Sequence, residues 1–116
     1  MLITVDDILR VIENNPKTYK WYIHDRYTET THEINNFRLK PDILVLCDDG
    51  EKIMNSNAVF KAARFLNLDT IVKVGLFHYQ YKHYTLFYHE KHIRDIIIQD
   101  KKIILIIDSA ERRWGR

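Results

Sequence analysis

Two short aliphatic runs constrain the fold of this chain more than any other feature. Residues 42–47 read DILVLC and residues 102–108 read KIILIID. A nearly continuous apolar run of this length is typical of a strand that is buried on both faces. Neither run is long enough to cross a membrane. The chain must therefore build a sheet and cover it, using only 116 residues.

The first helix is predicted over residues 4–15. Thr4 can cap this helix, with Asp7 three residues later in a variant of the capping box. An Asn-Asn-Pro sequence follows and ends the helical pattern. The apolar residues that share one helical face are Val5, Ile8, Leu9 and Ile12.

A second helix is predicted over residues 55–67, and a third is one of two interpretations of residues 90–98. The apolar face of the second helix consists of Val59, Ala62, Ala63 and Leu66. In residues 90–98, Ile93, Ile96 and Ile97 fit a helical face, whereas three consecutive isoleucines also suit a strand.

Strand-forming residues occupy most of the remaining chain. Residues 18–23 and 32–39 are predicted to pair as antiparallel strands, and residues 70–79 and 84–89 are predicted to form a hairpin. The turn sequence DDG at residues 48–50 predicts another hairpin, which returns through residues 51–54.

These elements predict a single small α+β domain over residues 1–116. We expect a mixed or mostly antiparallel sheet of about five to six strands with about two to three helices. Residues 109–116 are predicted to form a flexible basic tail.

Composition limits the cofactors, the setting and the partners. A formal net charge of +2 and a pI of about 8.6 permit nucleic-acid binding without requiring it. Cys47 is the only cysteine, which excludes an intrachain disulfide and a thiolate-rich zinc site. The first ten residues contain no cationic leader before an apolar run, so we expect a reducing, cytoplasmic setting. The abundance of Ile, Asn, Lys and Tyr is typical of AT-rich genomes, including those of many viruses and mobile elements.

The segment LFHYQYKHYTLFYHEKH, residues 76–92, concentrates the side chains most suited to a partner. It holds four of the six histidines together with four tyrosines. As a hairpin it would have an aromatic face and a more polar face, because side chains alternate along a strand. Such a surface can stack on bases and contact phosphates. The other interpretation is an amphipathic hairpin whose Tyr and Phe side chains belong to the core.

Metal chemistry has weaker support. The histidines of this segment have the spacings H-x4-H, H-x5-H and H-x2-H, which match no standard zinc pattern, so no metal or cofactor is expected. Asp48, Asp49 and Asp108 follow apolar runs, as Mg²⁺ ligands often do, but Asp-Asp-Gly is also what a tight turn requires. No G-x-S-x-G, Walker or Rossmann pattern occurs, so no catalytic residue is expected.

Residues 2–79 run in the predicted order helix, strand, Pro-Asp strand, hairpin, helix, strand. This order resembles the core of the PD-(D/E)xK nuclease fold. The resemblance places Glu13 in the first helix and Asp42 in the second strand. It also implies an acidic-x-Lys pair on the third strand, where this chain has Glu51 and Lys52 adjacent and therefore on opposite faces. The resemblance thus implies at most an inactive relative of these nucleases.

We therefore expect a non-catalytic protein that binds nucleic acid by neutralising phosphates and stacking aromatic side chains on bases. The residues expected to do so are His78, Tyr79, Tyr81, Lys82, His83, Lys91, Arg112, Arg113 and Trp114. Two other classes stay open: a module that binds and modulates a host or partner protein, and a metal-dependent or degenerate nuclease. A homodimer is expected, because two buried strands and two helices leave one face or edge of the sheet without cover.

Overall fold

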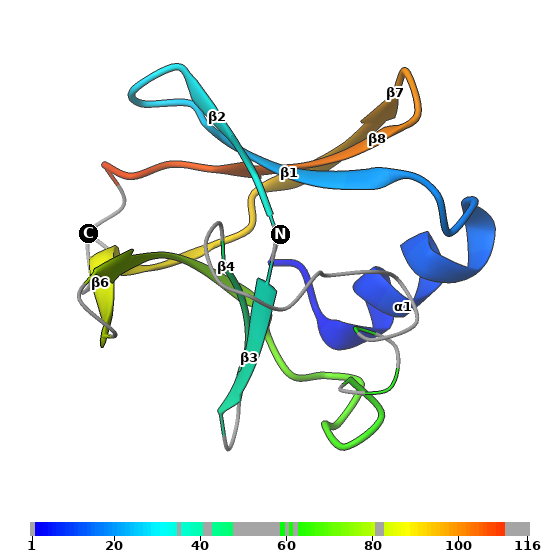
Figure 1. Cartoon of the computed structure of the whole chain (residues 1–116). Helices are drawn as coiled ribbons and strands as arrows, with labels where there is room; N and C mark the ends of the chain where they lie inside the picture. Colours follow the sequence, from blue (N-terminus) through cyan, green and yellow to red (C-terminus); the bar gives the residue numbers. More distant parts are fainter. Residues whose placement is uncertain are drawn as a thin grey trace.

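The chain forms one helix with defined bounds and eight strands within the residues that the structure describes (Figure 1). This computed structural model describes residues 2–34, 36–40, 43–47, 59, 61, 63–80 and 83–110, and for residues 36–40, 43–47, 75–80 and 83–90 it describes the backbone alone. The elements in chain order are α1 (Val5–Asn14), β1 (Lys20–Asp25), β2 (Thr30–Glu33), β3 (Asn36–Lys40), β4 (Ile43–Cys47), β5 (Lys73–Gln80), β6 (His83–His92), β7 (Asp95–Gln99) and β8 (Lys102–Ile107).

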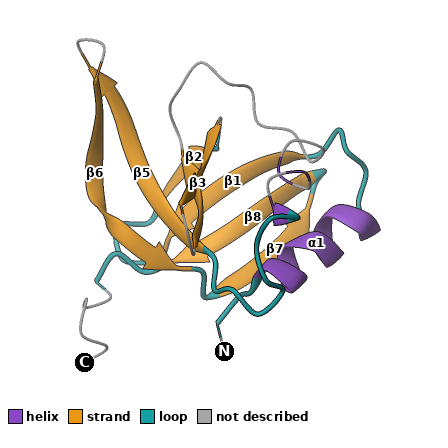
Figure 2. Cartoon of the chain, turned by 90° about the horizontal axis from the view of Figure 1, so that it is seen from below, coloured by secondary structure: helices purple, strands orange, loops and turns teal. Residues whose placement is uncertain are grey.

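The strands form two sheets rather than the single sheet predicted from the sequence. One sheet has the order β2-β1-β8-β7 and the other has the order β3-β4-β5-β6. In both views α1 lies at one end of the molecule and the β5–β6 hairpin lies at the opposite end (Figures 1 and 2). The α+β class and the compact single domain agree with the prediction, and the radius of gyration of 13.3 Å is what a compact domain of this length has.

Helix α1 forms as the sequence predicts. The Thr4 N–H donates to Asp7 Oδ2 at 2.8 Å, and the Asp7 N–H donates to Thr4 Oγ1 at 3.4 Å, which completes a capping box. At the other end, Asn15 Nδ2 donates to the Val11 carbonyl at 2.8 Å and so satisfies one of the last helical acceptors. The buried face consists of Val5, Ile8 and Ile12.

The centre of the first sheet is the parallel pair β1–β8, which confirms the strand predicted for the run KIILIID. Trp21 lies opposite Ile103 and Ile23 lies opposite Leu105, and all four side chains are buried. The opposite face of β8 is less buried, since it includes the exposed Lys102 and the half-buried Ile104. The face buried beneath β1 and β8 is therefore the main core of the protein.

The chain passes from one sheet to the other at Ile34. Residues 32–39, predicted as one antiparallel partner of β1, are divided instead: β2 pairs with β1, whereas β3 pairs with β4. Ile34 stands between them, with 4% of its surface exposed, and its N–H donates to the Trp21 carbonyl at 2.9 Å. Ile34 is thus buried where the chain passes from the first sheet to the second. Local strand propensity does not predict this change of sheet.

The second sheet contains the other aliphatic run and the predicted hairpin. Strand β4 confirms the run DILVLC as a strand, and it pairs in parallel with β5. Strands β5 and β6 pair in antiparallel orientation, which confirms the hairpin predicted for residues 70–79 and 84–89. The predicted turn at 48–50 and the return strand at 51–54 lie outside the described residues.

The predicted helix count is wrong in one place. Residues 90–98 form no helix, since β6 runs to His92 and β7 begins at Asp95, so the strand interpretation of the isoleucines is confirmed. The cause is tertiary, because β8 supplies a pairing partner along the whole of β7. In the second predicted helix, residues 59, 61 and 63 have helical backbone, and Val59 and Ala63 are buried as the predicted face requires.

Backbone hydrogen bonds hold the start of α1 against the segment that leads into β5. The Val5 N–H donates to the Thr70 carbonyl at 2.8 Å, and the Val72 N–H donates to the Ile3 carbonyl at 2.9 Å. These bonds close the core at the end of the molecule where α1 lies. No helix among the described residues is long and apolar enough to cross a membrane.

The capping box makes a first testable prediction. We expect Thr4→Ala to lower the free energy of unfolding by about 1 kcal/mol, because the N–H of Asp7 loses its acceptor. Urea denaturation of the wild type and the variant measures this difference. Thr18→Ala, at an exposed threonine outside the helix, is the matched control and should change stability little. Equal losses in both variants would contradict a specific role for the cap.

Candidate functional site

The β5–β6 hairpin contains most of the residues that the sequence predicts to contact a partner. His78 and Tyr79 lie in β5, whereas His83 and Lys91 lie in β6. Tyr79 is opposite Tyr84, and the adjacent pair in register is His78 with Thr85. Directly opposed residues belong to the same side of a two-stranded ribbon. The register therefore places an aromatic pair and a polar pair on alternate sides near the hairpin tip, as the sequence pattern predicts.

The regular alternation of side chains between the two sides of the hairpin is interrupted nearer its base. Leu76 is opposite Tyr88, but the next residue of β5, Phe77, is opposite Leu86, so the register shifts between them. A second shift lies between Val74 and Leu76. Both shifts add a residue to β6, and the first interrupts the alternation of sides that a regular hairpin would have. Gly75 stands between the shifted positions, and a glycine inside a strand was the available signal for such an irregularity.

The base of the hairpin is cationic. Lys73 is opposite His92, and the next pair in register is Val74 with Lys91. Lys73, Lys91 and His92 are half-buried, and Arg94 is exposed two residues beyond the end of β6. The sequence analysis included Lys91 alone of these residues. The register places Lys73 and His92 on one side of the ribbon and Lys91, in the next pair, on the other side.

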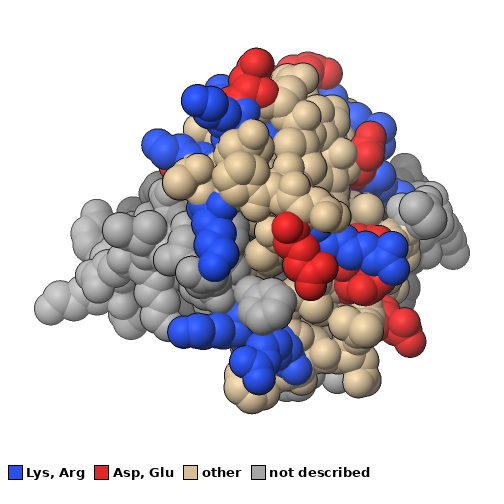
Figure 3. Space-filling view, turned by 90° about the vertical axis from the view of Figure 1, so that its right-hand side faces the viewer, with Lys and Arg blue, Asp and Glu red and all other residues tan. Residues whose placement is uncertain are grey.

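Charges of both signs alternate on the face of the molecule where α1 lies (Figure 3). On the exposed surface of α1, Arg10 Nε and Asp6 Oδ2 are 3.1 Å apart. On the first sheet, Lys20 Nζ lies 3.9 Å from Glu33 Oε1, and Lys102 Nζ lies 5.3 Å from the centre of the Tyr22 ring. These cations have partners within the chain.

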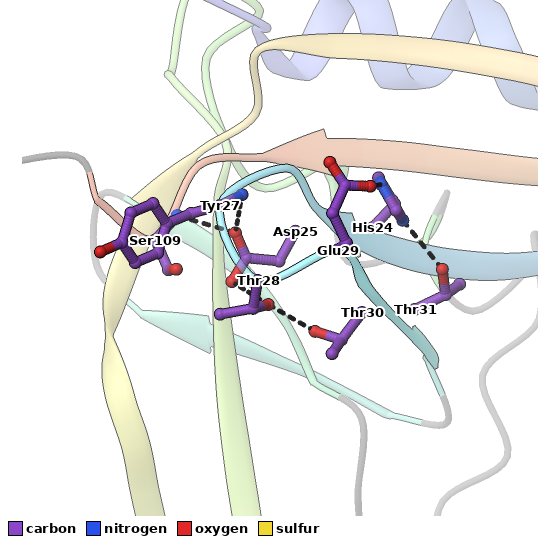
Figure 4. A network of polar contacts seen from close by, with 8 residues as sticks. All are labelled: His24, Asp25, Tyr27, Thr28, Glu29, Thr30, Thr31 and Ser109. Atoms are coloured by element: carbon purple, nitrogen blue, oxygen red, sulfur yellow. Dashed lines mark hydrogen bonds and ion pairs between the residues drawn. The ribbon is translucent and has the colours of Figure 1, made fainter.

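A buried carboxylate that the sequence analysis missed lies at the end of β1 (Figure 4). Asp25 has only 2% of its surface exposed. Its Oδ1 accepts hydrogen bonds from the Tyr27 and Ser109 N–H groups, each at 3.0 Å, and its Oδ2 accepts one from Thr28 Oγ1 at 3.0 Å. The Asp25 carboxylate thus joins the turn after β1 to the segment after β8.

These hydrogen bonds decide the charge state of Asp25. Burial alone would raise the pKa of the carboxyl group, but hydrogen bonds from the Ser109 side chain and backbone, the Tyr27 backbone and the Thr28 side chain outweigh it. The pKa of Asp25 is therefore lowered from its ordinary value of 3.8, and the group is ionised at neutral pH. A carboxylate whose oxygens are occupied in this way acts as a structural anchor rather than as a base.

The same anchor includes Ser109, the first residue of the predicted tail. Ser109 is bound to Asp25, and the Ala110 N–H donates to Asp108 Oδ1 at 2.9 Å, so the first residues of the predicted tail are held in place. Arg112, Arg113 and Trp114 lie outside the described residues, as do Tyr81 and Lys82.

Metal chemistry gains no support from the described part of the chain. Within it, no group of three or more His, Cys, Asp or Glu residues is arranged to hold an ion. His24 instead has its Nδ1 2.9 Å from Thr31 Oγ1, and its Nε2 lies 3.4 Å from Glu29 Oε2 (Figure 4). Asp108 is the acceptor for Ala110, whereas Asp48 and Asp49 lie outside the described residues.

The arrangement of the strands also departs from the order on which the nuclease resemblance rested. The strands of residues 2–79 are divided between two sheets, so they do not form one common sheet. Glu13 lies on the exposed side of α1, and Asp42, Glu51 and Lys52 lie outside the described residues.

Comparison with known proteins identifies no relative of this chain. No protein-family model, curated protein or solved structure matches the chain. The assignment of function therefore depends on the residues of this chain alone.

The buried carboxylate predicts a pH-dependent stability. Because the pKa of Asp25 is lower in the folded state than in the unfolded chain, its contribution is complete well above pH 3.8 and is lost as the pH falls through the folded-state value. We expect Asp25→Asn to lower the free energy of unfolding by about 2 kcal/mol at pH 7. This difference from the wild type should shrink between about pH 5 and about pH 3.

Denaturant unfolding at several pH values measures this difference directly. Asp69→Asn, at an exposed aspartate, removes the same formal charge and serves as the control. A wild-type-to-variant difference for Asp25→Asn that stays constant from pH 7 to pH 3 would show that the carboxylate charge is not what stabilises the anchor.

Proposed function

We propose that this chain binds nucleic acid through the β5–β6 hairpin and has no catalytic activity of its own. The observation that carries the proposal is the register of the hairpin. It pairs Tyr79 with Tyr84 at one end, and at the base it pairs Lys73 with His92 on one side of the ribbon and puts Lys91 in the next pair, on the other side. Aromatic side chains stack on bases of any sequence, and cations neutralise the phosphates between them. A nucleic acid would therefore stack its bases on the tyrosines at one end of the hairpin and place its phosphates near the cations at the other end.

The number of cationic side chains at the base of the hairpin determines the affinity and the salt dependence that we expect. Lys73 and Lys91 belong to successive pairs at the base of the hairpin, and Arg94 follows β6 in the chain. With about three neutralised phosphates, log K should fall with log salt at a slope of about −2 to −3. Binding should therefore be moderate, strongly salt-dependent and weakly sequence-specific.

Other predicted contacts are part of the same proposal. Tyr81 and Lys82 follow β5 directly in the chain and precede His83, so they are adjacent to the proposed surface in sequence. Arg112, Arg113 and Trp114 follow the anchored Ser109 by a few residues and are proposed to grip phosphate and stack on a base. A cytoplasmic setting, and an origin in a virus or mobile element, also belong to this proposal and rest on composition.

The cations at the base of the hairpin provide the main test. We expect the double variant Lys73→Ala/Lys91→Ala to bind a single-stranded oligonucleotide about tenfold more weakly at low salt, with a salt slope reduced by about 1 to 2. Fluorescence anisotropy at several salt concentrations gives both values.

The control for this test has the same net charge. Lys17→Ala/Lys61→Ala removes two exposed lysines from other parts of the chain, and circular dichroism shows whether both variants are folded. An equal loss of affinity in the two double variants would mean that only overall charge matters. Absence of binding to every single- or double-stranded DNA and RNA tested at low salt would overturn the proposal, and a salt-insensitive complex with a protein would favour the interaction module instead.

Tyr79 tests the stacking part of the proposal. We expect Tyr79→Leu to weaken binding of single-stranded DNA at least about fivefold, because stacking of one base contributes about 1–3 kcal/mol. Tyr27→Leu is the matched control, since Tyr27 is 69% exposed and lies in the turn after β1. Thermal denaturation of both variants separates the two interpretations of the aromatic face. A Tyr79→Leu variant with lower stability and unchanged affinity would assign Tyr79 to the core.

A further inference from the structure

Strand β7 forms an open edge of the first sheet among the described strands (Figure 1). Its sequence is Asp95-Ile-Ile-Ile-Gln99, with no proline or lysine, which are the residues that usually protect such an edge. Ile97 is 39% exposed and Ile98 is 41% exposed, although they belong to opposite faces of the strand. In Figure 3 the upper part of the molecule has a tan area that is bordered by charged residues of both signs.

The backbone groups on the open side of β7 follow from its pairing with β8. Gln99 is opposite Lys102 across the two-residue turn Asp100-Lys101, where both residues have positive φ, at 50° and 62°. In such a hairpin the closing pair is hydrogen-bonded and every second pair repeats this, so Ile96 and Ile98 direct their N–H and C=O groups away from β8. The Ile96 N–H accordingly bonds to Asp95 Oδ1, at 2.8 Å, rather than to the neighbouring strand.

The sequence around β7 is complementary to itself when two copies run antiparallel about Ile97. In this register Ile96 is opposite Ile98 of the second copy, so the outward backbone groups of both strands meet. One step further out, the Asp95 carboxylate faces the amide of Gln99, which can donate to it. At the ends, Arg94 is opposite Asp100, which brings opposite charges together twice by symmetry. Arg94, Asp95, Gln99 and Asp100 are all exposed in the single chain.

We propose that a second copy of this chain pairs with β7, edge to edge and antiparallel with Ile97 at the two-fold axis. The pairing extends the four-stranded sheet into a continuous sheet through both subunits. It covers the exposed isoleucines, and it replaces the Asp95–Ile96 contact by a hydrogen bond between the strands. This arrangement names the edge and the register of the homodimer that the sequence analysis expected only in general terms.

Pairing of one short strand sets an upper limit on the affinity. Five residues a side bury less than the roughly 1,000 Å² that a stable interface needs, and the Ile96 N–H already has a partner in the single chain. We therefore expect a reversible dimer with a Kd of about 10–100 μM, sensitive to any charge placed at the axis.

Sedimentation velocity of the full chain at increasing concentration tests the proposal. The wild type should shift from monomer to dimer between about 1 μM and about 500 μM. Ile97→Lys places two like charges directly opposite each other and should raise the Kd at least about tenfold. Tyr27→Lys, at another exposed apolar residue, should leave the Kd unchanged. A protein that stays monomeric throughout this range would overturn the proposal.

Cross-linking tests the register independently of affinity. In a Cys47→Ser background, Ile97→Cys places two cysteines at a pair without hydrogen bonds, where Cα atoms are about 4.5 Å apart and a disulfide fits. Ile98→Cys in the same background would have its cysteines about 8 Å apart and should cross-link slowly or not at all. Efficient cross-linking through Ile98→Cys rather than Ile97→Cys, or a dimer that Ile97→Lys does not weaken, would exclude this register and this edge.

Discussion

The parallel pairing of β1 with β8 is the contact on which the rest of the structure depends. It joins residues 20–25 to residues 102–107, and it buries Trp21, Ile23, Ile103 and Leu105 on one face. Helix α1 packs on this face, β2 and β7 attach to its two sides, and Ile34 leaves it to begin the second sheet. The Asp25 carboxylate closes the pair by binding Ser109, which lies 84 positions later in the chain. Two strands so distant in sequence gain stability only once both are in place, because the entropy of closing the intervening chain must be offset by their burial.

This arrangement separates the parts of the molecule that hold it together from those that can meet a partner. The buried face beneath β1 and β8 is apolar apart from the indole N–H of Trp21, and the Asp25 carboxylate at its end is hydrogen-bonded within the chain. The β5–β6 hairpin lies at the end of the molecule opposite α1, and β7 forms the open edge of the first sheet. The two proposed interactions therefore use different surfaces. A nucleic-acid partner would contact the hairpin of the second sheet, while a second copy would extend the first sheet.

Local sequence accounts for a large part of the fold. The cap formed by Thr4 and Asp7, the apolar face of α1, and the strands at both aliphatic runs depend on residues close together in the chain, and all were predicted. The candidate hairpin was predicted for the same reason, because alternation and turn position are local properties. The register shifts near Gly75 and the pairing of Lys73 with His92 were not predicted, since both depend on the alignment of two strands with each other. Asp25 was missed because nothing in the local sequence distinguishes a buried aspartate before a polar turn from an exposed one. Its distant hydrogen-bond donor, Ser109, is brought near only by folding.

The sequence by itself determined which segments become helix or strand, wherever the spacing of apolar residues and the turn residues agree within one element. Tertiary structure alone decided which strands become neighbours, that they form two sheets rather than one, and that residues 90–98 contain strand in place of helix. The physical reason is that three consecutive isoleucines fit either conformation locally, whereas β8 offers only one of these conformations a continuous row of hydrogen-bonding partners. The burial of Asp25 was decided in the same way, by a donor that folding brings to it from the other end of the chain.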